Sequence, residues 1–303
     1  MGTADYYPKY QRGLQNQLYD ILSSAAARGI NVRVILDKSN WSKNITRTNR
    51  ETKDYLTKRG VQVKFDSPSI TTHAKVVVID RDQILMGSSN WNYPTYTDSY
   101  QTNLLIKNRK VAASYAELFD LLWKSKSARI ELRENFRKAE RSIIPILNTP
   151  SSRHYFQIAK KVLSAADESI EIIMYRMGYY PSFKTSKSNI LMNKLIQACK
   201  RGVRVRVILE KSDWSESTNR KNRRAAWWLK LHNIEVKFDR PSVQTHAKLI
   251  VLDEESLLLG SSNWTYYSLQ KNIETDVLIQ NSPKLADYFV QLFDKLWNRG
   301  TSR

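Results

Sequence analysis

The sequence predicts an α/β fold made of two tandem α/β sandwich units. Three observations predict it: long stretches recur at one fixed offset, helical and strand periodicities alternate within each copy, and several strand segments are almost wholly apolar. Wholly apolar strands are typical of a sheet covered on both faces. With 303 residues, the chain is long enough for two units that each have a hydrophobic core.

The internal repeat is the strongest of these observations. The phrase THAKVVVID at residues 72–80 returns as THAKLIVLD at residues 245–253, an offset of 173 residues. The same offset relates RGINVRVILDKSNW (28–41) to RGVRVRVILEKSDW (201–214), VQVKF (61–65) to IEVKF (234–238), and the two copies of GSSNW (87–91 and 260–264). A repeat of this length indicates a duplicated domain. We place the first unit at residues 1–130 and the second at residues 131–303.

Within the first unit, periodicity predicts alternating helices and strands. Apolar residues from Leu14 to Ala25 (Leu14, Leu18, Ile21, Leu22, Ala25) have helical spacing, and Gly29 ends that helix. The further elements expected along the chain are a strand at 32–36, a helix near 49–58, strands at 61–65, 76–79, 84–86 and 104–106, and a closing helix around 115–122.

The two units differ at their openings. Residues 142–175 predict a strand, a helix and a strand ahead of the matched region, and the offset aligns Met1 with Met174. We therefore expect the first unit to lack its opening strand–helix–strand, through truncation or a misplaced start; the alternative is that this half has a smaller sheet.

Composition bears on partners and location. The 49 Lys and Arg against 29 Asp and Glu give a net charge of +20, which favours a polyanionic partner, nucleic acid ahead of an anionic membrane surface. The single cysteine, Cys199, excludes an internal disulfide. No apolar run approaches the ~20 residues of a membrane span, and the N-terminus does not have the pattern of a secretory signal. These features predict a cytoplasmic protein.

The repeated phrase supplies candidate catalytic groups. His73 and Lys75 in the first copy, and His246 and Lys248 in the second, are two residues apart on predicted strands and so share a face. The GSSN turns add hydroxyl, amide and backbone N–H donors that can hold phosphate oxygens, from Ser88, Asn90, Ser261 and Asn263. An imidazole, an ammonium group and neutral donors suit phosphodiester chemistry.

The aspartates of the phrase have a different expected role. Asp80 and Asp253 lie seven residues beyond the histidines, over ~20 Å away along an extended strand. We therefore expect them to be structural, pairing or capping at the far end of the strand.

HAKVVVID followed by six residues and GSSN resembles the HxKx4Dx6GSxN motif of the phospholipase D superfamily, and HAKLIVLD–EESLLL–GSSN is equally similar. The resemblance implies two units packed as a pseudo-twofold pair, with both motifs at one cleft of a monomer. It implies that one histidine attacks phosphorus and forms a phosphohistidine while the other protonates the leaving oxygen, and that neither a metal nor another cofactor is required.

The copies differ in one pair of polar residues. Glu274 stands 28 residues after His246, where single-motif nucleases of this superfamily have a supporting carboxylate, and Gln101 stands at the same spacing from His73. We therefore expect Glu274 to support His246 and to raise its pKa, which suits a general acid. We expect Gln101 to hold His73 neutral as the nucleophile; the alternative is that Gln101 marks drift in a weakened first site.

The motif leaves the class of phosphodiester open. Two loops combine tryptophan with basic residues, as expected for binding a nucleic-acid strand, through Lys38, Trp41, Lys211, Trp214 and Arg220. Tryptophans anchored in the core are the alternative. The sequence thus favours a metal-independent nuclease, an endonuclease on DNA or RNA. A phospholipase D or cardiolipin-synthase-like phosphatidyltransferase is the alternative enzyme, and a binding module with an inactive site is disfavoured by the intact motifs.

Overall fold

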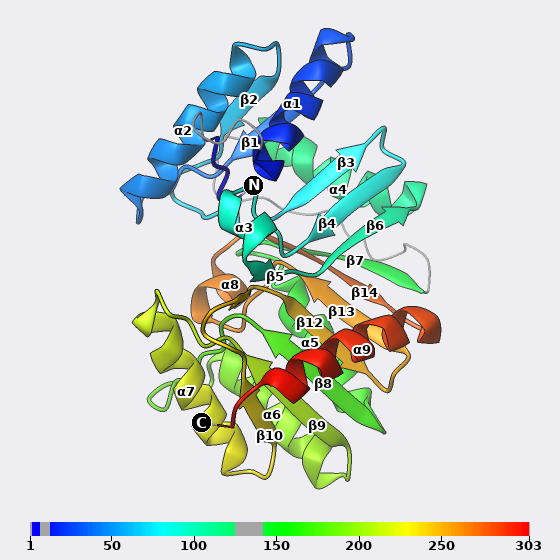
Figure 1. The fold of residues 1–303 in the computed structure, drawn as a ribbon. Helices are drawn as coiled ribbons and strands as arrows, with labels where there is room; N and C mark the ends of the chain where they lie inside the picture. The colour runs from blue at the N-terminus through cyan, green and yellow to red at the C-terminus, as the bar shows by residue number, and fades with distance from the viewer. Residues whose placement is uncertain (1, 7–12, 125–141, 303) are drawn as a thin grey trace.

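The computed structural model describes residues 2–6, 13–124 and 142–302. The chain forms two α/β halves that pack against each other (Figure 1), and the predicted fold class is confirmed. The predicted boundary between residues 130 and 131 lies outside the described residues. None of the helices in the described ranges is long and apolar enough to cross a membrane.

The second half is built on one seven-stranded sheet in the order β10–β9–β8–β12–β13–β14–β7. β8, β9 and β10 are parallel, and the remaining neighbours are antiparallel. The strands are β7 (Ile143–Asn148), β8 (Ser169–Met174), β9 (Arg204–Leu209), β10 (Glu235–Phe238), β12 (Lys248–Leu252), β13 (Ser256–Gly260) and β14 (Glu274–Ile279). The predicted strand–helix–strand opening is present as β7, α5 (His154–Ala165) and β8.

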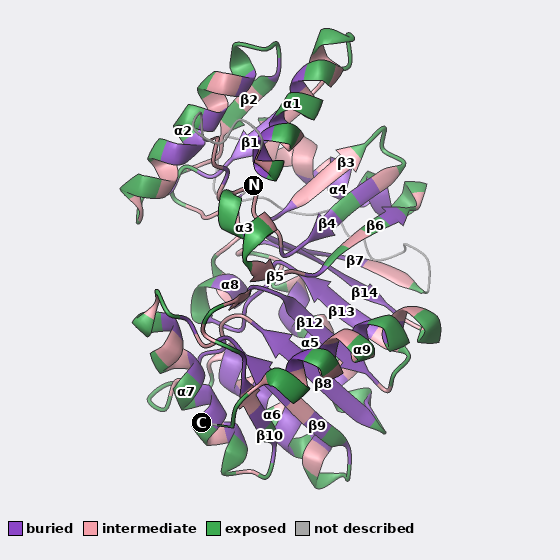
Figure 2. Cartoon of the chain, in the orientation of Figure 1, coloured by how far each residue is buried: buried purple, intermediate pink, exposed green. Residues whose placement is uncertain are grey.

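Helices cover both faces of this sheet. Alternate strand residues point to opposite faces, so Ile250 and Leu252 pack with α5, α6 (Lys187–Lys200) and α7 (Glu216–Lys230). Leu249 and Val251 pack instead with α9 (Pro283–Arg299) and with α4 (Arg109–Lys124) of the first half. A short helix, α8 (Tyr266–Gln270), follows β13. The sheet is therefore buried on both faces, as its apolar strands predict (Figure 2).

The first half repeats this plan, but its sheet is divided. β1 (Arg33–Leu36) pairs with β2 (Gln62–Phe65), and β3 (Val76–Ile79), β4 (Gln83–Gly87) and β6 (Asn103–Lys107) form a separate sheet. These pieces correspond to β9–β10 and to β12–β13–β14 at the 173-residue offset. In the second half β8 joins the two pieces by pairing with both β9 and β12. The described residues of the first half include no counterpart of β7, α5 or β8, as expected.

This division exposes apolar surface in the first half. Leu105 of β6 is 55% exposed, whereas the corresponding Leu278 of β14 is 3% exposed. The expectation that both faces of the apolar strands are covered is therefore wrong for β3, β4 and β6 (Figure 2). α1 (Leu14–Ala27) forms where predicted, but Leu14 and Ile21 are exposed and Tyr19 is buried. The corresponding α6 packs against α5, and no described helix takes the place of α5 beside α1.

α2 (Lys43–Thr57) begins earlier than the predicted helix near 49–58, because the Ser42 hydroxyl caps it by accepting a hydrogen bond from the Ile45 N–H at 3.3 Å. The halves are joined around short strands that precede or follow the two motifs. β5 (Ser99–Tyr100) pairs with β11 (Gln244–Thr245), and Thr72 bridges to Ile273. Tyr115 of α4 donates a hydrogen bond to the Asp276 carbonyl at 2.5 Å. These contacts bring both motifs to the junction of the halves.

Candidate active site

Each motif is held in place by backbone pairing with the opposite half. The His73 N–H donates to the Ile273 carbonyl and the His246 N–H to the Tyr100 carbonyl, both at 2.9 Å. Gly87 and Gly260 open the GSSN turns with φ of 156° and 157°, and a Cβ there would lie 2.1 Å from the Thr102 carbonyl and 2.4 Å from the Thr275 carbonyl. Only glycine fits such an approach of two backbones.

The histidine, lysine and asparagine side chains of the first motif lie close together around Gly2. A Cβ placed on Gly2 would lie 3.4 Å from Lys75 Nζ, 3.5 Å from Asn90 Oδ1 and 3.6 Å from His73 Cδ2. The second motif is packed against an aromatic ring instead: Tyr175 lies 4.6 Å from the His246 ring, and Lys248 Nζ lies 4.9 Å from the Tyr175 centroid. Gly2 and Tyr175 occupy equivalent positions of the repeat. Sequence reasoning missed this pair, although the 173-residue offset alone aligns them.

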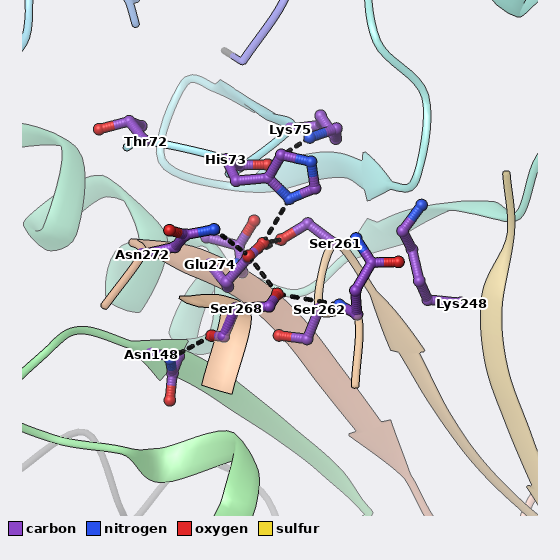
Figure 3. Close-up of polar contacts among 12 residues, drawn as sticks. Thr72, His73, Lys75, Asn148, Lys248, Ser261, Ser262, Ser268, Asn272 and Glu274 are labelled. Atoms are coloured by element: carbon purple, nitrogen blue, oxygen red, sulfur yellow. Dashed lines mark hydrogen bonds and ion pairs between the residues drawn. The ribbon is translucent and has the colours of Figure 1, made fainter. Parts of the chain in front are cut away.

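His73 is supported by a carboxylate from the other half. Its Nδ1 lies 2.8 Å from Glu274 Oε2, and Glu274 is fully buried (Figure 3). Ser261 donates to the same carboxylate at 2.6 Å, Asn272 donates at 3.1 Å, and Ser268 also bonds to it. Burial alone would raise the pKa of Glu274, but His73, Lys75 and these donors hold it below its usual value. Glu274 is therefore a carboxylate at neutral pH.

His246 is supported by neutral acceptors. Its Nδ1 lies 3.1 Å from the Ser88 carbonyl and 3.2 Å from Gln101 Oε1, so Nδ1 carries the proton. Burial, followed by the charges of Lys248 and Lys75 and by His73, lowers the pKa of His246 well below its usual value. Burial also lowers the pKa of His73, but there Glu274 opposes the shift. In both rings Nδ1 is occupied, which leaves Nε2 for chemistry.

The expected pairing within each half is therefore wrong. Glu274 supports His73, not His246, and Gln101 supports His246, not His73. The reason is how the halves pack. Glu274, at the start of β14, meets the first motif, and Gln101, just before β6, meets the second. Each histidine consequently depends on the other half, and Glu274 does not favour His246 as the acid.

Two buried lysines complete the positive side of the site. Each Nζ donates to the carbonyl of the histidine two residues before it, Lys75 to His73 and Lys248 to His246. Burial lowers the pKa of Lys75 to about 8, with Glu274 and Asp37 opposing the shift. Burial and the charge of Lys75 lower the pKa of Lys248 well below its usual value. An anion between the two lysines would relieve their repulsion.

The GSSN turns contribute less directly than expected. Ser88 donates to Gln101 Oε1 at 2.8 Å, Ser261 donates to Glu274, and both hydroxyls also accept a backbone N–H. Both side chains are fully buried, so the expected phosphate contacts of Ser88 and Ser261 are not available in this arrangement. By contrast, Oδ1 of Asn90 and of Asn263 is buried without a protein partner among the described residues.

The motif aspartates lie away from the chemistry. Asp253 accepts hydrogen bonds from the backbone N–H groups of Asp167, Glu168 and Ser169 at 2.8–3.3 Å, where β8 begins, and its expected structural role is confirmed. Asp80 is exposed at the corresponding end of β3. The described residues include no equivalents of the three residues that Asp253 binds. Its structural role stays a prediction.

The two predicted binding loops lie on the surface. Trp41 is 68% exposed and Trp214 is 55% exposed, so the alternative of tryptophans anchored in the core is wrong. Trp41 donates from its indole to Thr71 Oγ1 at 3.2 Å, two residues before His73. Lys38 and Arg220 are exposed, and Lys211 is half-buried. Within the described ranges, no group of three or more His, Cys, Asp or Glu side chains is arranged to hold a metal ion.

Two pairs of carboxylates, buried except for the half-buried Asp66, connect these loops to the motifs. Sequence reasoning also missed them. Glu210 accepts the Thr245 N–H at 2.6 Å and Asp239 accepts the Lys211 N–H at 2.5 Å. In the first half, Asp37 accepts the Thr72 N–H at 2.9 Å and Asp66 accepts the Lys38 N–H at 2.7 Å. The sequence does contain a signal for them, because Asp37 and Glu210, and likewise Asp66 and Asp239, are 173 residues apart.

Curated proteins with significant similarity include both nicking and lipid enzymes. The chain is 28% identical over 151 residues to the virion nicking-joining enzyme of vaccinia virus (strain Western Reserve), covering 48% of this chain and 34% of that protein. It is 23% identical to phospholipase D Z of Dictyostelium discoideum over 344 aligned positions, covering 96% of this chain and 77% of that protein. The chain thus spans about a third of the viral enzyme's length.

Among solved structures, phosphatidylserine synthase of Haemophilus influenzae has a TM-score of 0.71 at 14% identity, covering 99% of this chain and 80% of that one. That likeness concerns the fold. A family model described as cardiolipin synthase, PLD-like domain, matches residues 6–123 and 159–297, which include both motifs. The chain therefore belongs to the phospholipase D-like family.

Proposed function

We propose that the protein is a metal-independent phosphodiesterase that acts through a phosphohistidine, and that its substrate is nucleic acid. The observation that carries the proposal is the crossed pair of histidines, each with Nδ1 bonded to the other half, beside two buried lysines. Such a site offers a nucleophile, a proton donor and positive charge for the phosphate oxygens.

We infer that His73 is the nucleophile. Its side chain is 22% exposed, whereas His246 is nearly buried beneath Tyr175. The Nε2 lone pair of His73 forms the bond to phosphorus while the bond to the leaving oxygen breaks and its electron pair stays on that oxygen. The ring, still protonated on Nδ1, then carries positive charge, which the Glu274 carboxylate stabilises.

His246 is then the acid and base. The negative charge of the bound phosphodiester favours its protonated form, and Nε2–H gives its proton to the leaving oxygen. In the second step Nε2 takes a proton from water, the oxygen attacks phosphorus, and the electron pair of the P–N bond returns to His73. The charge of the bound substrate therefore opposes the burial that lowers the pKa of His246 in the free protein.

Nucleic acid is the preferred substrate because charge and aromatic groups coincide on the surface. The net charge is +20, and exposed Trp41 and Trp214 stand in loops rich in basic residues. Basic groups bind phosphates and exposed rings stack on bases. The nicking-joining name of the viral relative agrees with this choice. The match to phospholipase D Z over 96% of the chain favours phospholipid as the second candidate.

One assay separates these substrates. The protein is incubated in EDTA with labelled single- and double-stranded DNA and RNA, and with phosphatidylcholine and phosphatidylglycerol vesicles. We expect cleavage of nucleic acid. Turnover of lipid without cleavage of any nucleic acid would replace the proposed substrate, and activity that requires an added metal would contradict the mechanism.

A further inference from the structure

The His246 side of the site carries two cations outside both motifs. Arg176 follows β8 and Lys221 lies on α7. Asn222, next to Lys221, fixes the helix to this segment: its Nδ2 donates to the Tyr175 carbonyl at 2.9 Å, and its Oδ1 accepts the Met177 N–H at 2.8 Å. The positions of the Arg176–Lys221 pair are thus set by the backbone of the active site.

Tyr175 connects this pair to the catalytic groups. Arg176 Cζ lies 5.6 Å from the Tyr175 ring centroid, and Lys248 Nζ lies 4.9 Å from the same centroid. The ring also lies beside His246. Arg176 is therefore one aromatic ring away from the lysine expected to hold the reacting phosphate.

The pair has no counter-charge in the part of the chain that the structure describes. Neither residue takes part in any of the ion pairs of this part of the chain. Arg176 donates to Thr218 Oγ1 at 2.5 Å, and its Nε–H is buried without an acceptor. Burial, then the charges of Arg176 and Arg220, lowers the pKa of Lys221. Cations gathered in this way are stabilised by a bound anion.

Neither Glu210 nor Glu216 supplies that anion. Glu210, whose carbonyl accepts a hydrogen bond from Asn222, has its pKa raised to about 10 by burial and by Asp239, so it is neutral at pH 7. Glu216, in the first turn of α7, pairs with Arg223. The unmatched positive charge is therefore available to a ligand.

The first half has no equivalent pair. At the 173-residue offset, Tyr175 corresponds to Gly2, Arg176 to Thr3 and Lys221 to Thr48. The His73 side therefore has no aromatic ring and no charged side chain at these positions, while the His246 side is aromatic and cationic. The two sides of the cleft differ in what they can bind next to the reacting phosphate.

We propose that Arg176 and Lys221 form a subsite for the phosphate adjoining the reacting one, on the leaving-group side of the substrate. The subsite rests on the proposed nuclease function and deepens it. It orients a polynucleotide at the site. The leaving strand, whose oxygen takes the proton from His246, binds Arg176 and Lys221 through its next phosphate. A phosphodiester with one phosphate would leave the subsite empty.

Three dinucleotides test the subsite, because each has a single internal diester: TpT, pTpT and TpTp. We expect one of the two terminal phosphates, and not the other, to raise kcat/KM over TpT by about tenfold or more, the worth of charge-assisted hydrogen bonds. In Arg176→Thr and Lys221→Thr, which install the residues of the first half, the ratio of kcat/KM for that substrate over TpT falls toward one.

Lys194→Thr, at a half-buried position of α6, is the matched control that removes one positive charge and keeps the ratio. Thermal unfolding checks each variant, and Lys221→Thr is the cleaner of the two because Arg176→Thr also loses the bond to Thr218. A ratio that persists in both variants overturns the subsite, as does equal cleavage of the three substrates by the unmodified protein. Turnover of lipid with no dinucleotide cleaved overturns the nuclease proposal itself.

Discussion

The two halves have nearly the same motif but different surroundings, both in the core and at the site. The second half has one continuous sheet with helices on both faces, whereas the sheet of the first half is divided, with no counterpart of β8 among the described residues. At the site, His73 has a buried carboxylate and is next to Gly2, which has no side chain, while His246 has neutral acceptors and packs against Tyr175. The duplication therefore produced unequal partners that complete each other.

The largest expected effect separates the two histidines. His73→Ala removes the nucleophile, so kcat falls by about 10³-fold or more for every substrate. His246→Ala slows substrates with alkoxide leaving groups by about the same factor, because the leaving oxygen then lacks its proton. A p-nitrophenyl phosphodiester does not need this acid, because p-nitrophenolate leaves without a proton. With this substrate, His246→Ala should release one equivalent of p-nitrophenolate in a burst and then stall, because the second step lacks its base.

Stopped-flow absorbance measures that burst. The same burst from His73→Ala, and none from His246→Ala, would exchange the roles of the two residues.

The crossed supports are tested by exchanging their charges. Glu274→Gln should lower kcat by about 10²-fold, the scale of losing one buried charge that stabilises the transition state. Because Glu274 opposes the lowering of the His73 pKa, the same variant should move the His73 titration to lower pH. Gln101→Glu should raise the pKa of His246. NMR titration of the two imidazoles checks both, and a shift of His246 in Glu274→Gln would restore pairing within each half.

The structural difference is tested at aligned positions of α6 and α1. Leu191 is fully buried, and Leu191→Ala should lower the free energy of unfolding by about 2–5 kcal/mol. Leu18, the corresponding residue, is only half-buried, and Leu18→Ala should cost about 1 kcal/mol. Chemical denaturation measures both. Equal losses would mean that the outer face of α1 is covered in solution.

The smallest expected effect is a change in the pH profile. A lysine loses its charge as pH rises through its pKa, so the value of about 8 for Lys75 predicts that kcat/KM falls above about pH 8. In Lys75→Arg the guanidinium stays charged, and this fall should move to higher pH even though the rate is lower. An alkaline limb at the same pH in both proteins would remove Lys75 as its origin.

The sequence predicts the duplicated α/β units, the strands of each unit and the two motifs, because periodicity and recurrence are local properties. It misleads on Glu274 and Gln101. A spacing of 28 residues from a histidine does not say which histidine the side chain contacts, because the packing of the two halves decides that. The sequence also misleads on the burial of β3 and β6: Leu105 is apolar, but no described helix covers its face of the sheet. Gly2 and Tyr175 lie outside the motif and are visible only through the repeat offset.

The most direct test of the crossed site is to locate the covalent phosphate. The protein is mixed with excess substrate, quenched within one turnover in alkaline denaturant, where phosphohistidine survives, and digested for mass spectrometry. The crossed site predicts phosphate on the peptide that contains His73, whose ring Glu274 supports from the opposite half. Phosphate on the peptide that contains His246 would contradict it.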